Sequence, residues 1–312
     1  MVDWRELYPF PSQFIELAGG VKMHYVETGA KNVNGSANRQ TVLCVHGNPT
    51  WSFTYRRVLA ELGSHVRVVA VDHVGCGLSD KPQKYRYSLD QHIANLVQLI
   101  IQLDLRHVTL LVHDWGGAIG LGAGLQVLER IEGATILNTA AFPPAYIPVR
   151  IAACRIPVIG NWAMRQLNVF ALAALKMTLH RLPKLDAKVA AGLIAPYSNW
   201  DNRVAIARFV QDIPRTPADP TWRLLADIEQ QLARYGTRPI KLLWGMQDWC
   251  FRPECLHRFQ QLLPHARTQE LSDVGHYVME EAADEVLAAV RSQLASGVEH
   301  VPAADQPATT PA

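Results

Sequence analysis

Asp114 stands in a sequence context that is typical of an activated nucleophile. It lies in the run HDWGG at residues 113–117, which follows an apolar segment and precedes a stretch of small residues. A strand that turns sharply into a helix has this pattern, because small residues let the turn tighten and lift one side chain clear of the backbone. An aspartate that only caps the following helix would show the same run. The choice between the two therefore depends on residues elsewhere in the chain.

Two further residues have the types and the order of a catalytic triad. Asp248 follows an apolar run at 240–244, and His276 follows another at 268–271. A nucleophile, an acid and a histidine in this order meet when the strands that precede them are parallel neighbours. Asp248 would then orient the imidazole of His276 and stabilise its charged form. Taken alone, either residue is explained equally well as part of a turn.

Two uncharged hydrogen-bond donors are expected beside Asp114. Asn48 follows an apolar run at 41–45 and offers an amide, and Trp115 offers an indole N–H. Because neither donor ionises at neutral pH, this anion-binding pair suits a negative charge that appears as a bond breaks. An aspartate nucleophile can displace such a leaving group from a saturated carbon and form an alkyl ester. Water activated by His276 would then cleave that ester.

The elements that must position these residues are alternating strands and helices. Ser88 and Gln91 have the spacing of a capping box at the start of a crossover helix. Residues 14–17 and 21–26 flank two glycines and indicate an antiparallel hairpin at the edge of a sheet. Continuous apolar runs suit parallel strands buried on both faces, and the predicted fold class is therefore α/β. These runs are 41–45, 66–71, 108–112, 134–137, 240–244 and 268–271.

The alternation stops after 134–137 and resumes near 238, which leaves a segment too long for a loop. We expect a body of residues 1–143 and 238–295, a helical cap at 144–237 and a disordered tail at 296–312. Residues 145–180 combine an apolar composition with basic but no acidic residues, so they suit a lid over a lipophilic pocket that also contacts a membrane surface or a partner. Ordinary amphipathic helices packed on the body explain the composition equally well. The basic residues are Arg150, Arg155, Arg165 and Lys176.

Composition excludes several classes of partner. The 312 residues carry a formal net charge of +2 and no basic stripe with interleaved aromatic residues, so no nucleic-acid partner is expected. The longest run without a charged residue, 133–149, contains three prolines, so we expect no transmembrane segment. Residues 1–12 include Asp3 and Glu6 and no apolar stretch, which predicts a cytoplasmic protein. No group of side chains has metal-ligand spacing, and neither a metal nor a cofactor is expected.

Three segments resemble the haloalkane dehalogenase branch of the α/β-hydrolases over about residues 8–295. They are HGNPTWS at 46–52, DHVGCGLSDKP at 72–82 and the run around Asp114. The resemblance implies an α/β-hydrolase fold, with a mostly parallel central sheet flanked by helices and an inserted helical cap. It also implies that Asp114 is the nucleophile, His276 the base, and Asn48 with Trp115 the leaving-group site. One dehalogenase branch carries its acid as Glu after the preceding strand, but residues 137–139 read Leu-Asn-Thr here, so the acid should be Asp248.

Several segments, many in the cap, look closer still to the β-lactone decarboxylases of bacterial long-chain olefin biosynthesis. This resemblance implies conversion of a cis-3,4-dialkyl-oxetan-2-one into a cis-alkene and carbon dioxide, and association with the ligase-like and reductase enzymes of that pathway. An apolar cap suits two alkyl chains, since each buried methylene contributes about 0.8 kcal/mol. We expect Phe142, Tyr197, Trp200 and Phe209 to line the substrate pocket. The segments are ILNTAAF at 136–142, APYSNW at 195–200, NR at 202–203, RF at 208–209, QDIP at 211–214 and GHYV at 275–278.

The residues leave other functions open. A haloalkane dehalogenase would use the same five residues with halide as the leaving anion. An epoxide hydrolase would use Tyr146 and Tyr197 as donors to the ring oxygen, but Asn48 stands where that family more often has an aromatic residue. A non-catalytic lipid-binding protein on this fold is a third alternative. On a β-lactone, Asp114 could attack the ring carbon that bears the oxygen or the carbonyl, and the sequence does not choose.

Overall fold

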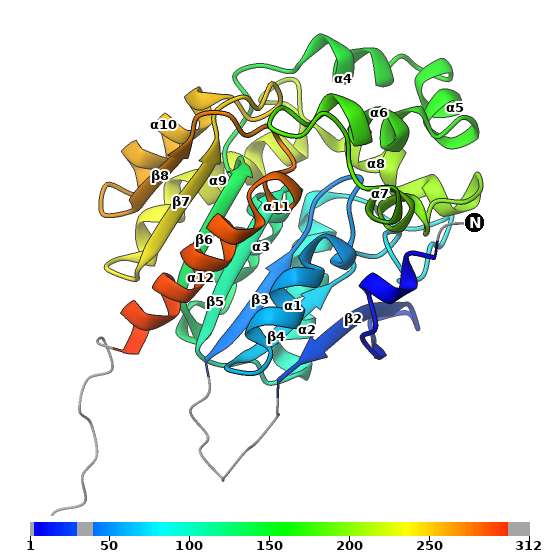
Figure 1. Cartoon of the computed structure of the whole chain (residues 1–312). Coiled ribbons are helices and arrows are strands. Elements are labelled where there is room, and N and C mark those ends of the chain that lie inside the picture. The colour runs from blue at the N-terminus through cyan, green and yellow to red at the C-terminus, as the bar shows by residue number, and fades with distance from the viewer. Residues whose placement is uncertain (1–2, 30–39, 299–312) are drawn as a thin grey trace, which may run out of the picture.

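The computed structural model describes residues 3–29 and 40–298, and within them one eight-stranded sheet forms the centre of the molecule (Figure 1). Its strand order is β1-β2-β4-β3-β5-β6-β7-β8. β2 pairs antiparallel with β1 and β4, and the pairs from β4 to β8 are parallel. The strands are β1 (Ser12–Glu16), β2 (Lys22–Thr28), β3 (Thr41–Val45), β4 (Arg67–Val71), β5 (Val108–Asp114), β6 (Ile131–Thr139), β7 (Ile240–Gly245) and β8 (Arg267–Leu271).

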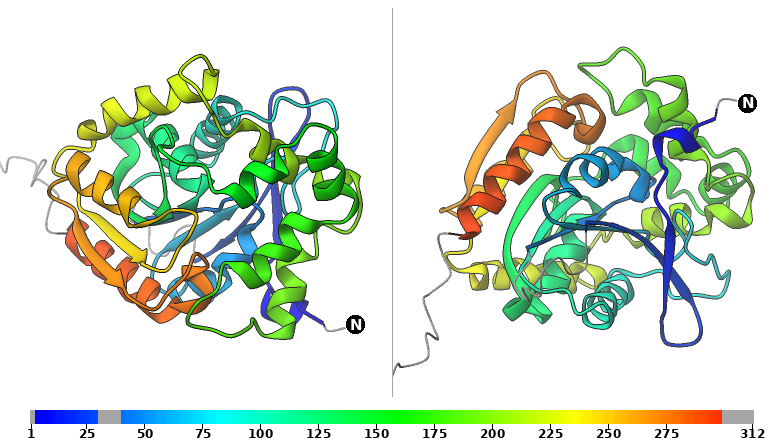
Figure 2. Two further views of the ribbon diagram at one scale, coloured as in Figure 1. Left: turned by 90° about the horizontal axis from the view of Figure 1, so that it is seen from above. Right: turned by 60° about the horizontal axis from the view of Figure 1, so that its bottom comes forward.

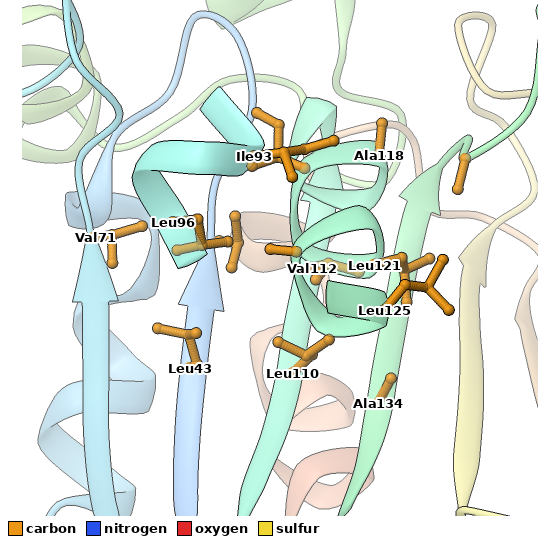
Figure 3. Packing of buried hydrophobic residues seen from close by; sticks show 14 of the residues in the cluster. Leu43, Val71, Ile93, Leu96, Leu110, Val112, Ala118, Leu121, Leu125 and Ala134 are labelled. Atoms are coloured by element: carbon orange, nitrogen blue, oxygen red, sulfur yellow. The ribbon is translucent and has the colours of Figure 1, made fainter. Parts of the chain in front are cut away.

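Helices cover both faces of the sheet, as the continuous apolar strands require. One face carries α1 (Arg56–Leu62) and α12 (Ala283–Val298), and the other carries α2 (Leu89–Gln102), α3 (Trp115–Gln126) and α10 (Pro253–Leu262) (Figure 2). Figure 3 shows Leu96 of α2 near Val112 of β5 and Ile93 of α2 near Ala118 of α3, all fully or almost fully buried. The predicted α/β class, the edge hairpin and the parallel strands are confirmed.

Six helices are inserted between β6 and β7. Of these, α4 to α8 lie above the carboxyl ends of the strands (Figure 1), whereas α9 packs against α2 and α3. The segment expected to be a cap, 144–237, therefore includes one helix that packs on the body. The inserted helices are α4 (Val149–Cys154), α5 (Ile159–Gln166), α6 (Val169–Met177), α7 (Ala187–Ile194), α8 (Val204–Asp212) and α9 (Pro220–Gln231).

Short elements complete the chain. The four-residue α11 (Val278–Glu281) follows β8. The 3-10 helices are η1 (Arg5–Leu7), η2 (Ser52–Tyr55), η3 (Leu128–Arg130), η4 (Asp201–Arg203) and η5 (Leu232–Tyr235). α12 continues to Val298, so the prediction that disorder begins at 296 is wrong for its first three residues, and the remainder of the expected tail lies outside the described residues. None of the helices in the described part of the chain has the length and apolar character needed to cross a membrane.

The capping box predicted at the start of α2 is wrong in its contacts. The helix does begin directly after Ser88, but the Ser88 hydroxyl donates to Asp90 Oδ1 at 2.6 Å and makes no capping bond. Instead, the Leu89 N–H donates at 2.8 Å to Asp212 Oδ2, at the end of α8 in the insertion. The local pattern could not reveal this, because the capping carboxylate lies more than a hundred positions further along the chain. The contact ties the insertion to the body.

We expect the stability conferred by Asp212 to depend on pH. Burial raises the pKa of Asp212 to about 6, against the opposing hydrogen bonds from Thr221 and Leu89. Because this folded-state pKa lies above that of the unfolded chain, the folded protein binds the proton more tightly, and stability falls as pH rises through the interval between the two pKa values. Asp212→Asn cannot ionise, so its unfolding free energy relative to wild type should rise by about 2 kcal/mol between about pH 4 and about pH 8.

Urea denaturation of both proteins at the two pH values measures this change. Asp227→Asn, on the exposed side of α9, is the control and should follow wild type at both. Parallel pH profiles for Asp212→Asn and wild type would contradict the assignment.

Candidate active site

Asp114 occupies the turn between β5 and α3. Its φ of 53° lies in the left-handed region, which side chains other than glycine rarely adopt. Thr139 supports the turn by donating a hydrogen bond to the Asp114 carbonyl. The two following glycines are required by space, since a Cβ at Gly116 would collide with the Val45 carbonyl and one at Gly117 with Thr139. The HDWGG run therefore forms the sharp strand-to-helix turn that its composition predicts.

The Asp114 carboxylate is buried and held by backbone donors. Its Oδ1 accepts a 2.6 Å hydrogen bond from the Asn48 N–H, and the backbone N–H of Trp115 also donates to the carboxylate group. Burial raises the pKa of Asp114, while the charge of His276 and these two backbone donors oppose that rise. The carboxylate is thus directed and only weakly solvated, which favours nucleophilic attack by its ionised form.

Gly47 is a further position on which the site depends. A Cβ there would collide with Oδ1, Cβ and Cγ of Asp114. We expect Gly47→Ala to displace the carboxylate and to slow labelling of Asp114 by an active-site-directed alkyl halide about 100-fold, the cost of an ångström-scale misplacement. Mass spectrometry of the labelled peptide against time gives the rate. Gly236→Ala is the control, because its φ of 62° strains the new side chain far from the cavity; it should lose stability but keep the labelling rate.

His276 lies between two carboxylates. Its Nδ1 is 2.8 Å from Asp248 Oδ2, and its Nε2 is 3.7 Å from Asp114 Oδ2. Burial disfavours the charged imidazolium, but Asp248 and Asp114 outweigh it and raise the pKa of His276. The imidazole is therefore oriented by Asp248 and directed at the nucleophile, and the three residues of the predicted triad lie together.

Asp248 is fixed by contacts that the sequence analysis did not anticipate. Its Oδ2 also accepts from Asn138 Nδ2 at 3.1 Å, and its Oδ1 accepts from the Cys250 N–H at 2.6 Å. Burial opposes ionisation, but His276, together with the N–H donors of Cys250 and Phe251, lowers the pKa of Asp248 below its ordinary value. The sequence analysis gave Asn138 no role of its own, either as the position where an acid is missing or as part of the segment 136–142. Its place at the carboxyl end of a buried strand was the signal that could have revealed it.

His113 is a second residue that the sequence analysis missed. Its Nε2 lies 2.9 Å from the His276 carbonyl oxygen, and the two rings lie 4.6 Å apart. Burial lowers the pKa of His113 to about 3, so it is neutral and can donate this hydrogen bond. His113 therefore positions the backbone of the base. Its direct attachment to Asp114 in the HDWGG run was the available signal.

The anion-binding pair borders the same space as the triad. Asn48 Nδ2 donates at 3.2 Å to the Ile206 carbonyl of α8, which leaves its second N–H for another acceptor. The indole N–H of Trp115 makes no hydrogen bond within the described residues, and its ring rests 5.5 Å from the ring of Phe209. Both side chains line the main cavity, as do Asp114 and His276. This arrangement can attack an electrophilic carbon and hold an anion released from it.

The cavity has a volume of about 410 Å³ and mostly apolar walls. Phe142 lines it, as predicted. The inserted helices and the loops beside them supply the opposite wall, so an alkyl chain is the kind of group that this space accommodates. Among the wall residues are Ile147, Ile151, Phe170, Val210, Ile213 and Trp249.

The prediction that Tyr197, Trp200 and Phe209 line the pocket is wrong. The Tyr197 hydroxyl donates to the Thr50 carbonyl at 3.1 Å, so this side chain fastens the insertion to the body. Trp200 lies outside the cavity lining, beneath the guanidinium of Arg165 at 4.3 Å. Phe209 is buried behind Trp115 and stacks on the imidazole ring of His92. It supports the indole without reaching the cavity.

Across residues 3–29 and 40–298, no three His, Cys, Asp or Glu side chains are grouped to hold a metal ion.

Comparison with known proteins agrees with this geometry. Residues 40–283 match the family described as alpha/beta hydrolase fold. The chain is 36% identical to a cis-3-alkyl-4-alkyloxetan-2-one decarboxylase of Shewanella oneidensis, over 91% of this chain and 88% of the relative. It is 35% identical to the enzyme of the same name from Xanthomonas campestris pv. campestris, with 92% and 97% covered. It is 30% identical to haloalkane dehalogenase 2 of Mycobacterium tuberculosis, with 91% and 95% covered.

Solved structures support the fold. The haloalkane dehalogenase DbeA of Bradyrhizobium elkani superposes with a TM-score of 0.83 at 22% identity, over 94% of this chain and all of that one. The similarity covers both halves of the body and the insertion between them, and it agrees with the sharp turn at Asp114, the triad and the inserted helices described above. The chain therefore belongs to the α/β-hydrolase family, within its haloalkane dehalogenase-like branch.

Proposed function

We propose that this protein converts a cis-3,4-dialkyl β-lactone into a cis-alkene and carbon dioxide. The observation that carries the proposal is an aspartate nucleophile and two neutral anion donors on one apolar cavity. The two relatives at 35% and 36% identity, both named as decarboxylases of such lactones, support the choice of substrate. A dialkyl β-lactone presents an electrophilic ring carbon, a carboxylate leaving group and alkyl chains, which match these three features.

The first step would be attack by Asp114 on the ring carbon that bears the lactone oxygen. A bond forms between the Asp114 oxygen and this carbon, and the carbon–oxygen bond of the ring breaks with inversion. The released group is a carboxylate, which Asn48 and Trp115 would hold by hydrogen bonds. The strained ring contributes to the driving force. The product of this step is an alkyl ester of Asp114 with a carboxylate on the neighbouring carbon.

The second step would be elimination. The bond to the carboxylate carbon breaks, its electron pair forms the alkene, and the Asp114 carboxylate leaves as carbon dioxide departs. Inversion followed by anti elimination retains the cis geometry of the lactone. Neither water nor a proton is consumed, so His276 would act electrostatically and in hydrolysing any ester that stalls. Asp114 is regenerated at the end of each cycle.

A direct test uses two substrates. Purified protein is incubated with a cis-dialkyl β-lactone and, separately, with a long-chain bromoalkane, and alkene, carbon dioxide and bromide are quantified. Alkene and carbon dioxide in equal amounts, with much slower bromide release, are the expected result. Bromide release without alkene would establish the second candidate, a haloalkane dehalogenase, which the same site and the relatives at 30% identity favour.

An epoxide hydrolase is less well supported. Of its two proposed tyrosine donors, Tyr146 lines the cavity, but the Tyr197 hydroxyl is bonded to the Thr50 carbonyl. We also infer a cytoplasmic location and association with other enzymes of olefin synthesis, on the basis of the sequence resemblance. Copurification from the native host with no enzyme of that pathway would count against the association.

A further inference from the structure

The outer side of the cap carries a concentration of exposed apolar side chains. Val158, Val149 and Ile159 are 81%, 76% and 66% exposed. Outside the segment 146–177, the described residues have exposed large apolar side chains only at Phe14, Leu78 and Ile101. We call the following set the cap face: Tyr146, Val149, Ile156, Val158, Ile159, Trp162, Leu167, Leu172 and Met177.

Most residues of the cap face lie on three consecutive helices beside the cavity. These helices are α4, α5 and α6, and α5 packs against both of the others at the edge of the molecule farthest from the lower ends of the strands (Figure 1). Ile159 and Trp162 are three positions apart at the start of α5, so they lie on the same side of that helix, and Val158 directly precedes it. Tyr146 and Met177 belong both to the cap face and to the cavity lining. A molecule on this face therefore lies next to the cavity wall.

The segment that carries the cap face has charged side chains of one sign only. Residues 145–180 contain no Asp or Glu. Arg150 and Lys176 are exposed, and neither has a carboxylate partner within the described residues. At the cavity rim, the Arg150 guanidinium lies 5.3 Å from the centre of the Trp249 ring, and that of Arg252 lies 3.7 Å from the centre of the Tyr146 ring. Cations among exposed apolar and aromatic side chains complement a surface of lipid phosphates over an apolar interior.

We propose that the cap face binds the surface of an anionic phospholipid bilayer and that the lipophilic substrate passes from the bilayer into the adjacent cavity. Val158 and Ile159 would enter the region between headgroups and acyl chains, Trp162 would lie at the headgroup level, and Arg150 and Lys176 would contact phosphates. A protein interface would require carboxylates on the partner to match these cations, whereas an anionic membrane supplies phosphates over the whole surface. The passage of substrate from the bilayer into the cavity rests on the proposed function, but only because it assumes that the substrate is lipophilic.

Vesicle sedimentation tests the binding step without substrate. The full-length protein is mixed with vesicles of phosphatidylcholine alone or of phosphatidylcholine and phosphatidylglycerol, and the bound fraction is measured. Binding should be confined largely to the anionic vesicles. Ile159→Asp should lower the partition coefficient about tenfold, from the loss of a buried apolar side chain. Lys176→Gln should lower it about fivefold, the effect of one basic residue at a charged surface.

The control is Ile101→Asp, the same change at a 53% exposed isoleucine on the helix layer away from the cap, which should bind vesicles like wild type. Ile159 is the first residue of α5, where an aspartate favours the helix, so the variant should fold. In a second readout, Ile159→Asp should slow turnover of a lactone embedded in anionic vesicles but not of a short-chain lactone in detergent. If the wild-type protein turned over neither lactone, the proposed function would be contradicted. The membrane proposal would still be tested, because vesicle sedimentation needs no substrate.

Two results would overturn the membrane proposal. One is wild-type protein that stays in the supernatant with both kinds of vesicle. The other is equal binding by Ile159→Asp, Ile101→Asp and wild type. If wild type bound no vesicles but formed oligomers that Ile159→Asp abolished in gel filtration, the cap face would be a protein interface instead.

Discussion

Asp114→Asn should reduce alkene formation from a cis-dialkyl β-lactone by at least about 10⁴-fold in kcat/KM, the scale on which enzymes lose activity with their nucleophile. The amide lacks the negative charge that attacks the ring carbon. Its oxygen can still accept the hydrogen bond from the Asn48 N–H, so the turn between β5 and α3 should persist. Alkene measured by gas chromatography, with thermal unfolding to check the fold, gives the result.

The matched control for this variant is Asp227→Asn on the exposed side of α9, which should behave as wild type. Alkene production by Asp114→Asn at the wild-type rate would exclude a covalent aspartyl intermediate. The positive φ of Asp114 and the anion donors beside it would then need another explanation.

His276→Gln should separate the two candidate functions. Decarboxylation consumes no water, so turnover of the lactone should continue past one equivalent, slowed by up to about 100-fold through the loss of electrostatic support. Dehalogenation requires water to cleave the Asp114 ester, so bromide release should stop at one equivalent per enzyme. Mass spectrometry should then find an alkyl group on Asp114 after incubation with bromoalkane. The assays are run well above the pKa of Asp114, so that this carboxylate stays ionised when the positive neighbour is removed.

His257→Gln is the control for this experiment, because His257 is exposed on α10 and distant from the cavity lining. If the lactone also stopped after one turnover and left an adduct on Asp114, hydrolysis of the ester would be part of the lactone cycle. The elimination step proposed above would then be wrong.

The residues that could be predicted from the sequence are those held by the ends of strands. Asp114 is the last residue of β5, and Asp248 and His276 come shortly after β7 and β8; such strand ends meet at one edge of the sheet whatever the details of packing. The chain order of the three therefore indicated their arrangement. Asn48 follows the same rule, since it lies in the loop that begins at the end of β3.

Residues in the insertion between β6 and β7 could not be placed from the sequence, because the direction of their side chains depends on how the inserted helices dock on the body. Tyr197, Trp200 and Phe209 look alike as candidates for a pocket wall, but each contacts a different part of the molecule. Asn138 was missed for a related reason, since its role depends on a hydrogen bond to Asp248 on a neighbouring strand. A contact between residues that are far apart in the chain leaves no recognisable pattern in the sequence around either of them.

The hydrogen bond from Asn48 Nδ2 to the Ile206 carbonyl links leaving-group stabilisation to substrate shape. One half of the anion-binding pair takes its orientation from α8, and α8 also supplies Val210 to the cavity wall. An alkyl chain that shifts α8 would therefore rotate a donor that acts in bond breaking. Chain-length preference in this enzyme should then appear in kcat as well as in KM, because the binding energy of the chain is partly used to align the donor with the departing carboxylate.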